Sequence, residues 1–144
     1  MPFRKFKKVL CINDNEITLW VQRQILNKAM FSEDVVSFLN GRGALEYCNK
    51  LISNNVDPAC FYPDLIFLDL HMPVMDGWEF LRNFSIEIWP YFKDTKVIVT
   101  SYSIDEEHSE RAKAYPFVID FLTASLSTDY LKKLQTSLAS YESA

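Results

Sequence analysis

Five short apolar segments divide the chain, and each of them ends in polar or turn-forming residues. They cover residues 8–12, 35–39, 64–69, 96–101 and 117–122. Apolar runs of this length, bounded by such residues, predict buried strands. Helices are predicted over residues 16–30, 43–53, 76–84, 105–115 and 128–141. Strands that alternate with helices predict an α/β fold of the (βα)5 type, a doubly wound five-stranded parallel sheet with helices on both faces.

The connecting segments carry weaker signals. Residues 54–63 are polar and contain proline, which predicts a loop. Residues 85–96 are interrupted by Pro90 and hold three aromatic residues, which predicts a loop packed against the body of the protein. Asn15 and Ser127 are suitable caps for the first and last helices. In the first helix, Ile17, Trp20 and Val21 belong to the apolar face expected of an amphipathic helix.

Three polar residues end predicted strands or follow them directly: Asp14, Asp69 and Thr100. Crossover connections between parallel strands are right-handed, so the carboxyl ends of all the strands lie at one edge of the sheet. Open α/β sheets bind their ligands at that edge. We therefore expect the three residues to lie close together. Asp69 is the most informative of them, because an acid that follows Phe67 and Leu68 needs a polar partner.

Carboxylates and a hydroxyl at one edge of a sheet suit metal-assisted phosphoryl chemistry. Two converging carboxylates repel each other, and without compensation one of them takes up a proton. Mg²⁺ accepts one or two carboxylates and keeps positions open for phosphate oxygens. Beside it, Asp69 is a suitable nucleophile toward phosphorus and Thr100 a suitable donor. Simpler roles stay open here: Asp14 as a helix cap, Thr100 as a strand end, and Asp76-Gly77 as a turn.

Length, charge and cysteine content narrow the class of protein. A chain of 144 residues predicts a single domain, residues 1–144, with a core from about 7 to 140. Its net charge of −4 gives no broad basic surface for nucleic acid. No apolar run approaches the length that spans a bilayer, and no signal peptide is evident, so we expect a cytoplasmic protein without membrane contact. Cys11, Cys48 and Cys60 lack paired spacing and are expected to be buried or incidental thiols.

The segment from Asp64 to Gly77 contains the pattern Asp-hydrophobic-x-Met-Pro-x-Met-Asp-Gly, which starts at Asp69. It resembles the phosphoacceptor region of response regulator receiver domains, the CheY-like family of two-component signalling. The resemblance extends over roughly residues 7–138. It implies a flavodoxin-like, CheY-like sheet with strand order 2-1-3-4-5. It also implies that the chain is not an enzyme, apart from self-catalysed phosphoryl transfer to Asp69 and its hydrolysis.

The resemblance further implies a phosphoacceptor and a magnesium site. Asp69 would accept a phosphoryl group from a sensor histidine kinase or a phosphotransfer protein, in a step that depends on Mg²⁺. The metal ligands would be Asp14, Asp69 and the backbone carbonyl of His71, with Asn13 as a further contact through water.

The same resemblance implies a switch and a signalling surface. Thr100 would contact the phosphoryl group and move with it, and the aromatic residue Phe121 would change rotamer in concert. The last predicted helix ends near the C-terminus, so we expect a stand-alone receiver that signals to a downstream protein partner. The face formed by the fourth helix, the fifth strand and the fifth helix is the candidate surface for a homodimer.

Two residues depart from the family pattern. Asn13 stands where the first member of an acidic pair is usual, and Ala124 stands where a lysine normally bridges to the phosphoryl group. Asp14 and Asp69 give the pocket a formal charge of −2. The three acids and one lysine of the usual family pocket give the same formal charge. We therefore expect Mg²⁺ to bind only modestly more weakly than in a typical family member, and the phosphoryl group to be stabilised much less. Tyr102 is expected to shield Asp69 from water and slow the loss of a phosphoryl group.

Several functions remain in competition at this stage. The first is a phosphorylation-switched receiver, favoured by the intact Asp14, Asp69 and Thr100. The second is an atypical receiver with an impaired or lost switch that acts as a constitutive protein-interaction module, favoured by Asn13 and Ala124. An aspartate-nucleophile phosphatase is disfavoured, because the second aspartate of haloacid-dehalogenase-like enzymes is replaced by a histidine. A flavin-binding protein is disfavoured, because the loop after the first strand has no glycine to approach a phosphate.

Overall fold

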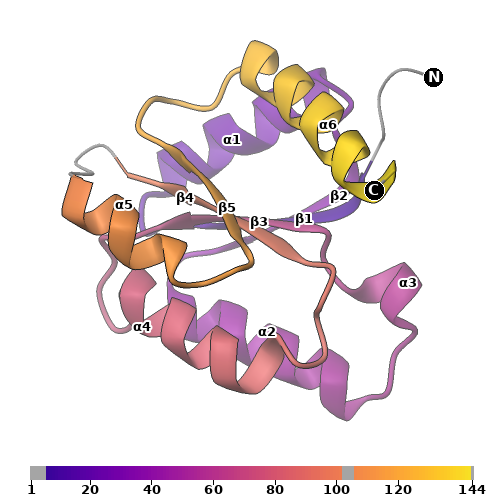
Figure 1. Ribbon diagram of the computed structural model, residues 1–144, viewed down its shortest axis with the longest axis vertical. Coiled ribbons are helices and arrows are strands. Elements are labelled where there is room, and N and C mark those ends of the chain that lie inside the picture. Colours follow the sequence, from indigo (N-terminus) through magenta and orange to yellow (C-terminus); the bar gives the residue numbers. More distant parts are fainter. Residues whose placement is uncertain (1–5, 102–105, 144) are drawn as a thin grey trace.

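The computed structural model describes residues 6–101 and 106–143, with side chains in the second range described for residues 107–138. Five strands form one parallel sheet in the order β2-β1-β3-β4-β5 (Figure 1). The strands are β1 (Phe6–Ile12), β2 (Ser32–Phe38), β3 (Leu65–Asp69), β4 (Lys96–Thr100) and β5 (Val118–Leu122). The α/β class predicted from the sequence pattern and the strand order implied by the family resemblance are both confirmed.

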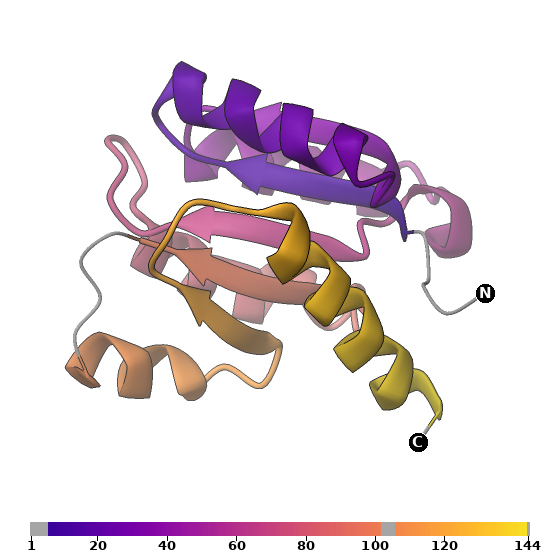
Figure 2. The same cartoon turned by 90° about the horizontal axis from the view of Figure 1, so that it is seen from above.

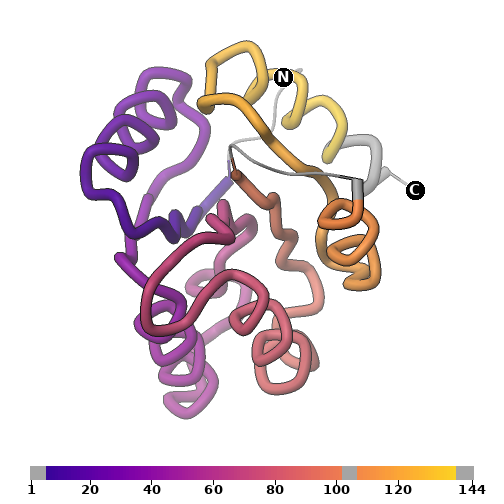
Figure 3. The backbone as a smooth tube through the Cα atoms, turned by 90° about the vertical axis from the view of Figure 1, so that its left-hand side faces the viewer, coloured from indigo at the N-terminus to yellow at the C-terminus, as the bar shows by residue number. Residues whose placement is uncertain are grey.

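Helices cover both faces of this sheet. They are α1 (Glu16–Lys28), α2 (Gly41–Ser53), α3 (Pro58–Phe61), α4 (Gly77–Asn83), the π-helical segment η1 (Phe84–Ile88), α5 (Glu106–Lys113) and α6 (Thr128–Ser143). Helices α1 and α6 lie on one face, and α2, α4 and α5 lie on the other (Figures 1 and 3). Within the described residues, no helix combines the length and the apolar character needed to cross a membrane.

Two predicted loops contain helical turns instead. The short helix α3 lies within residues 54–63, where Asp57 caps it by accepting a hydrogen bond from the amide of Ala59. In the second segment the chain continues from α4 into η1, and the amide of Trp89 donates to the carbonyl of Phe84 at 2.8 Å. The wider turn of a π-helix places Phe84 and Ile88 together in the core, where both are fully buried. The expectation of a loop was wrong here because burial of these two side chains outweighs the signal of the nearby proline.

Side-chain caps define where the helices begin. Asn15 accepts hydrogen bonds from the amides of Ile17 and Thr18, which caps α1 as predicted. Ser127 caps α6 by accepting from the amide of Tyr130 at 3.1 Å. Each cap satisfies a backbone donor that a helix terminus leaves without an internal partner.

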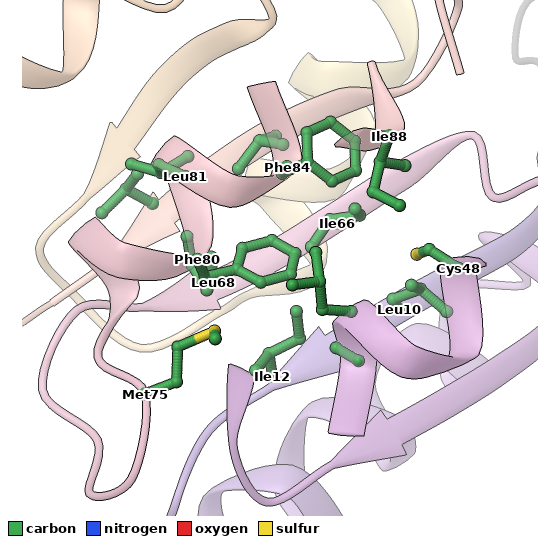
Figure 4. Close-up of a cluster of buried hydrophobic side chains, with 14 of the residues drawn as sticks. Leu10, Ile12, Cys48, Ile66, Leu68, Met75, Phe80, Leu81, Phe84 and Ile88 are labelled. Atoms are coloured by element: carbon green, nitrogen blue, oxygen red, sulfur yellow. The ribbon is translucent and has the colours of Figure 1, made fainter. Parts of the chain in front are cut away.

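The sheet separates two hydrophobic clusters. In β3, Leu65 and Phe67 pack toward α1 and α6, whereas Ile66 and Leu68 pack toward α2, α4 and η1 (Figure 4). This alternation follows from the period of two along a strand. A strand that is apolar on both faces is what the unbroken apolar runs of the sequence predict.

Two of the three cysteines are part of these clusters. Cys11 and Cys48 are fully buried, and burial raises the pKa of each thiol to about 12. Thiols with so high a pKa carry almost no thiolate at neutral pH and are chemically inert. Cys60 is exposed, and its thiol lies 3.3 Å from the carboxylate of Asp57.

Candidate functional site

Asp69 and Thr100 end neighbouring strands and stand directly beside each other. They are register partners in the pairing of β3 with β4, and the backbones of paired strands lie about 4.8 Å apart. Asp69 continues the alternation of Leu65 and Phe67, so its side chain points to the face covered by α1 and α6. Thr100 follows Ile98 to the same face. The structure thus brings the carboxylate and the hydroxyl together at the carboxyl edge of the sheet.

The loop after Asp69 projects beyond the sheet but is anchored on the protein (Figure 2). Leu70, Met72 and Met75 are buried, and the side chain of Met75 reaches toward Phe80 in the core (Figure 4). The amide of Gly77 donates to the carbonyl of Leu70 at 2.9 Å, which closes the loop at its base. The main chain around Asp69 is therefore held from both sides.

The β1 side of the site combines a buried amide with an exposed acid. Asn13 is only 8% exposed, and its side-chain oxygen accepts a hydrogen bond from the amide of Asn15 at 2.9 Å. Asp14 is exposed and borders an open depression together with Asn40 and Pro73. Loops that follow three different strands therefore meet next to Asp14.

The electrostatic environment of Asp69 shows that the two acids influence each other. Partial burial raises the pKa of the Asp69 carboxyl, and the negative charge of Asp14 raises it further. Hydrogen bonds from the backbone amides of His71 and Leu70 act in the opposite direction and lower this pKa, but the raising effects win. Ionised Asp69 is therefore destabilised in the protein without a bound cation.

This shift predicts a pH-dependent cost to stability in the metal-free protein. Because the pKa of Asp69 is raised above 3.8 on folding, the folded state binds more protons than the unfolded state as the pH rises past 3.8, and stability falls through that window. Asp69→Asn removes the cost, so we expect a higher free energy of unfolding at pH 7, by at most about 1 kcal/mol because solvent screens a half-exposed group.

Urea denaturation in the presence of EDTA, at a series of pH values from 4 to 7, measures this difference. The gap between Asp69→Asn and the wild type should widen as the pH rises. Asp94→Asn, at an exposed aspartate near the opposite, amino-terminal edge of the sheet, is the control. A gap that widens toward acid would contradict the argument.

The donor set at this edge fits a hard divalent cation. Asp14 and Asp69 supply carboxylate oxygens whose mutual repulsion a cation relieves, and the backbone carbonyl of His71, two residues after Asp69, would be a third oxygen donor. Among the described residues, no cluster of three or more His, Cys, Asp or Glu side chains forms a metal site. A cation at Asp14 and Asp69 would therefore keep several water ligands, which is typical of Mg²⁺.

A pocket of about 140 Å³ opens next to Asp69, on the side of α1. It is lined by Asp69, Thr100, Asn13 and the loop between β5 and α6, including the exposed Ala124. The hydroxyl oxygen of Thr100 is buried and has no hydrogen-bond partner within the described part of the chain. An unpaired buried donor beside a nucleophilic carboxylate is available to a ligand.

Phe121 lies on the opposite face of the sheet from Asp69. The register of β5 shifts between Val118 and Asp120, so a β-bulge inserts one residue. As a result Phe121 pairs with Val99 and packs with the α2 and α4 cluster, while Asp120 turns to the other face. There the carboxylate of Asp120 accepts a 2.6 Å hydrogen bond from the hydroxyl of Tyr130 in α6.

Sequence reasoning missed two residues that line the pocket and misplaced three residues of α1. Gln22 and Ser101 are buried polar residues that line it, although no motif marks them. Ile17, Trp20 and Val21 were expected on the inner face of α1, but they are 74%, 61% and 37% exposed. The helix buries Leu19 and Gln22 instead, together with Leu26, which was expected on the apolar face. Tyr102, expected to shield Asp69 from water, lies outside the described residues.

Comparisons with known proteins agree with the sequence motif. The family model of the response regulator receiver domain matches residues 9–134. No curated protein matches the chain.

Solved structures with the same fold extend over nearly the whole chain. A two-component response regulator from Cytophaga hutchinsonii is 25% identical with a TM-score of 0.83, over 95% of this chain and 99% of that one. The receiver domain of the histidine kinase CKI1 from Arabidopsis thaliana, in complex with Mg²⁺ and BeF₃⁻, is 27% identical with a TM-score of 0.70, over 96% and 91%. The chemotaxis protein CheY4 of Vibrio cholerae, at 22% identity and a TM-score of 0.71 over 93% and 98%, shares the fold. This chain belongs to the response regulator receiver domain family.

Proposed function

We propose that this receiver domain accepts a phosphoryl group on Asp69 from a sensor histidine kinase or a phosphotransfer protein. The observation that carries the proposal is the meeting of Asp69, Thr100 and the charge of Asp14 at one edge of the sheet, next to an open pocket. A carboxylate in such a place needs a partner, and a phosphoryl group with its metal supplies one.

In the proposed step a carboxylate oxygen of Asp69 attacks phosphorus. The bond from phosphorus to the donor breaks, which is a phosphorus–nitrogen bond in a phosphohistidine, and the imidazole leaves with the electron pair. The hydroxyl of Thr100, buried and unpaired among the described residues, then donates to a phosphoryl oxygen. The chain is not an enzyme in this proposal beyond this self-modification and the later hydrolysis of the acyl phosphate.

The site would hold Mg²⁺ through Asp14, Asp69 and the carbonyl of His71, with Asn13 in contact through water. The CKI1 receiver domain binds Mg²⁺ together with BeF₃⁻, an ion that has the shape and charge of a phosphoryl group. Bound Mg²⁺ would neutralise charge on the transferring phosphoryl oxygens. Since the side-chain oxygen of Asn13 already accepts from Asn15, its contribution would be secondary to those of the two carboxylates.

Intact mass spectrometry tests the proposal. Incubation with Mg²⁺ and acetyl phosphate should add one phosphoryl group to the wild type, and Asp69→Ala should abolish the addition. Asp94→Ala, an exposed aspartate far from the site, should be modified as the wild type is. An unmodified wild type with an intact fold would overturn phosphoryl acceptance.

The exposed apolar residues of α1 are the proposed docking surface for the phosphodonor protein. Ile17 and Val21 line the pocket beside Asp69, and Trp20 stands next to them on the outside of the helix. A donor must bring its phosphohistidine to Asp69, so its surface has to cover the rim of this pocket. An apolar helix face of this kind fits an apolar face on the partner.

Trp20→Ala should separate protein-mediated from small-molecule phosphorylation. Tryptophan at the centre of an interface often carries much of the binding energy, so we expect at least about tenfold slower transfer from a phosphotransfer protein that phosphorylates the wild type. Phosphorylation by acetyl phosphate should be unchanged. Ile86→Ala, at an exposed residue on the opposite face, is the matched control; equal effects of both variants would rule out α1 as the docking surface.

A second candidate is a constitutive interaction module that has lost the switch. Ala124 favours it, because no described residue lining the pocket next to Asp69 carries a positive charge. In either case the output is a downstream protein partner. The face formed by α5, β5 and α6 remains our candidate for self-association.

A further inference from the structure

Besides Asp69 and Thr100, the pocket next to Asp69 has features of a binding site that the phosphoryl chemistry does not use. Its volume of about 140 Å³ is about ten times that of the smallest cavity that holds a water molecule. Ile17, Val21, Leu122 and Leu126 form apolar walls. The exposed Ala124 lies at the rim, so the pocket opens to solvent beside its methyl group.

Three of the residues that line this pocket carry a buried, uncharged side-chain oxygen that lacks a hydrogen-bond partner anywhere in residues 6–101 and 107–138. These oxygens belong to the side chains of Gln22, Thr100 and Ser101. Gln22 and Ser101 are 6% and 4% exposed, so little solvent reaches them. Buried polar atoms are normally paired, and each unpaired atom needs a partner from elsewhere.

The charge of the pocket indicates whether that partner is a cation or an anion. The carboxylate of Asp69 is the one ionisable group among the described lining residues. All the unpaired atoms are oxygens and can accept hydrogen bonds. A cation with several donors therefore satisfies the site, whereas an anion is repelled by Asp69. Apolar walls with a single carboxylate are a poor match for a bare divalent metal, which prefers several charged oxygen ligands.

We propose that this pocket binds the ammonium head and alkyl chain of a small primary amine. An ammonium group has three donors, which matches Asp69 together with the oxygens of Gln22 and Thr100 or Ser101. The alkyl chain would run along Leu122 and the other apolar walls to the rim at Ala124. Propylammonium has the three carbon atoms and the nitrogen by which a lysine side chain exceeds the methyl group of alanine. The amine would share Asp69 and Thr100 with the proposed phosphoryl chemistry, but its binding can be measured without phosphoryl transfer.

Titration of the ¹⁵N-labelled protein with propylammonium chloride, without Mg²⁺ or a phosphodonor, tests the proposal. We expect saturable shifts of the backbone amides of Gln22, Ser101 and Ala124, with a dissociation constant on the order of 1–10 mM because so small a ligand buries little surface. Sodium chloride at equal ionic strength should leave these amides unshifted. The neutral isostere 1-propanol should bind at least about tenfold more weakly, since it lacks the charge that Asp69 recognises.

Variants of the lining residues show where propylammonium binds and how much each residue contributes to its affinity. Ala124→Lys should lose binding by at least about tenfold because its own ammonium group fills the pocket, and the neutral Ala124→Gln should also lose it by closing the rim. Gln22→Leu keeps the volume and removes an acceptor, so affinity should fall at least about fivefold. Gln24→Leu, at an exposed position of the same helix, should bind as the wild type does. Equal binding of 1-propanol, or unchanged binding by Gln22→Leu and Ala124→Lys, would overturn the proposal.

Discussion

Gly77→Ala will lower the free energy of unfolding by about 3 kcal/mol, because the added methyl group would collide with main-chain atoms that cannot easily move away. An added Cβ would lie 2.6 Å from the Cα of Leu70 and 2.7 Å from the carbonyl oxygen of Asp69. Both are main-chain atoms at the end of β3, so the loop that holds Asp69 must shift. We expect phosphorylation of Asp69 to be slowed as well.

Gly43→Ala is the matched control for this prediction. Its Cβ would meet nothing closer than the Phe38 ring at 3.5 Å, in the first turn of α2. Alanine favours helix over glycine, so this variant should be more stable than the wild type by up to about 1 kcal/mol. Urea denaturation followed by circular dichroism measures both variants. A loss below about 1 kcal/mol for Gly77→Ala would show that the loop is not held as tightly as its contacts indicate.

Ala124→Lys will accelerate phosphorylation of Asp69 by acetyl phosphate by about tenfold to a hundredfold. A lysine at this position places a cation at the rim of the pocket that Asp69 and Thr100 line. Negative charge on the phosphoryl oxygens is then stabilised by a donor that the present chain lacks. The gain is smaller than the full value of a buried donor, because position 124 is exposed and solvent screens the charge.

Ala124→Gln separates charge from size in this experiment. Its side chain resembles lysine in reach but is neutral, so it should give less than about a threefold change in rate if charge is what matters. The measurement is the rate of mass addition at fixed Mg²⁺ and acetyl phosphate. Equal rates for wild type and Ala124→Lys would contradict a role for a cation at this position. Abolition of the reaction by Asp69→Ala in the lysine background confirms that the same residue is modified.

Patterns of local sequence were sufficient for most of the fold. Apolar runs such as residues 64–69 allow few alternatives to a buried strand, and the order of the strands followed from family resemblance. The π-helical turn at Phe84–Ile88 escaped prediction, because nothing local to it indicates that Phe84 and Ile88 must reach one core together. Its cause is tertiary packing, which periodicity along the sequence does not report.

The site was only partly accessible from sequence for a related reason. Asp69 and Thr100 could be placed because each ends a strand, and strand ends share one edge. Gln22 was overlooked, since a polar residue in an amphipathic helix is normally assigned to solvent. The helix instead leaves most of Ile17 and Trp20 exposed and buries Gln22. The rotation of a helix about its axis depends on what it packs against, so residue pattern alone did not determine it.

The extra residue in β5 decides on which side of the sheet its aromatic side chain lies. With uninterrupted alternation, Phe121 would share a face with Asp69 and Thr100 and could touch a group bound there. The bulge puts it across the sheet, with Val99 beside it. Within the described residues, the direct connection from Asp69 to Phe121 therefore runs through the paired main chains of β4 and β5. The sheet thus separates the carboxylate of Asp69 from the ring of Phe121, so any coupling proposed between the two has to cross it.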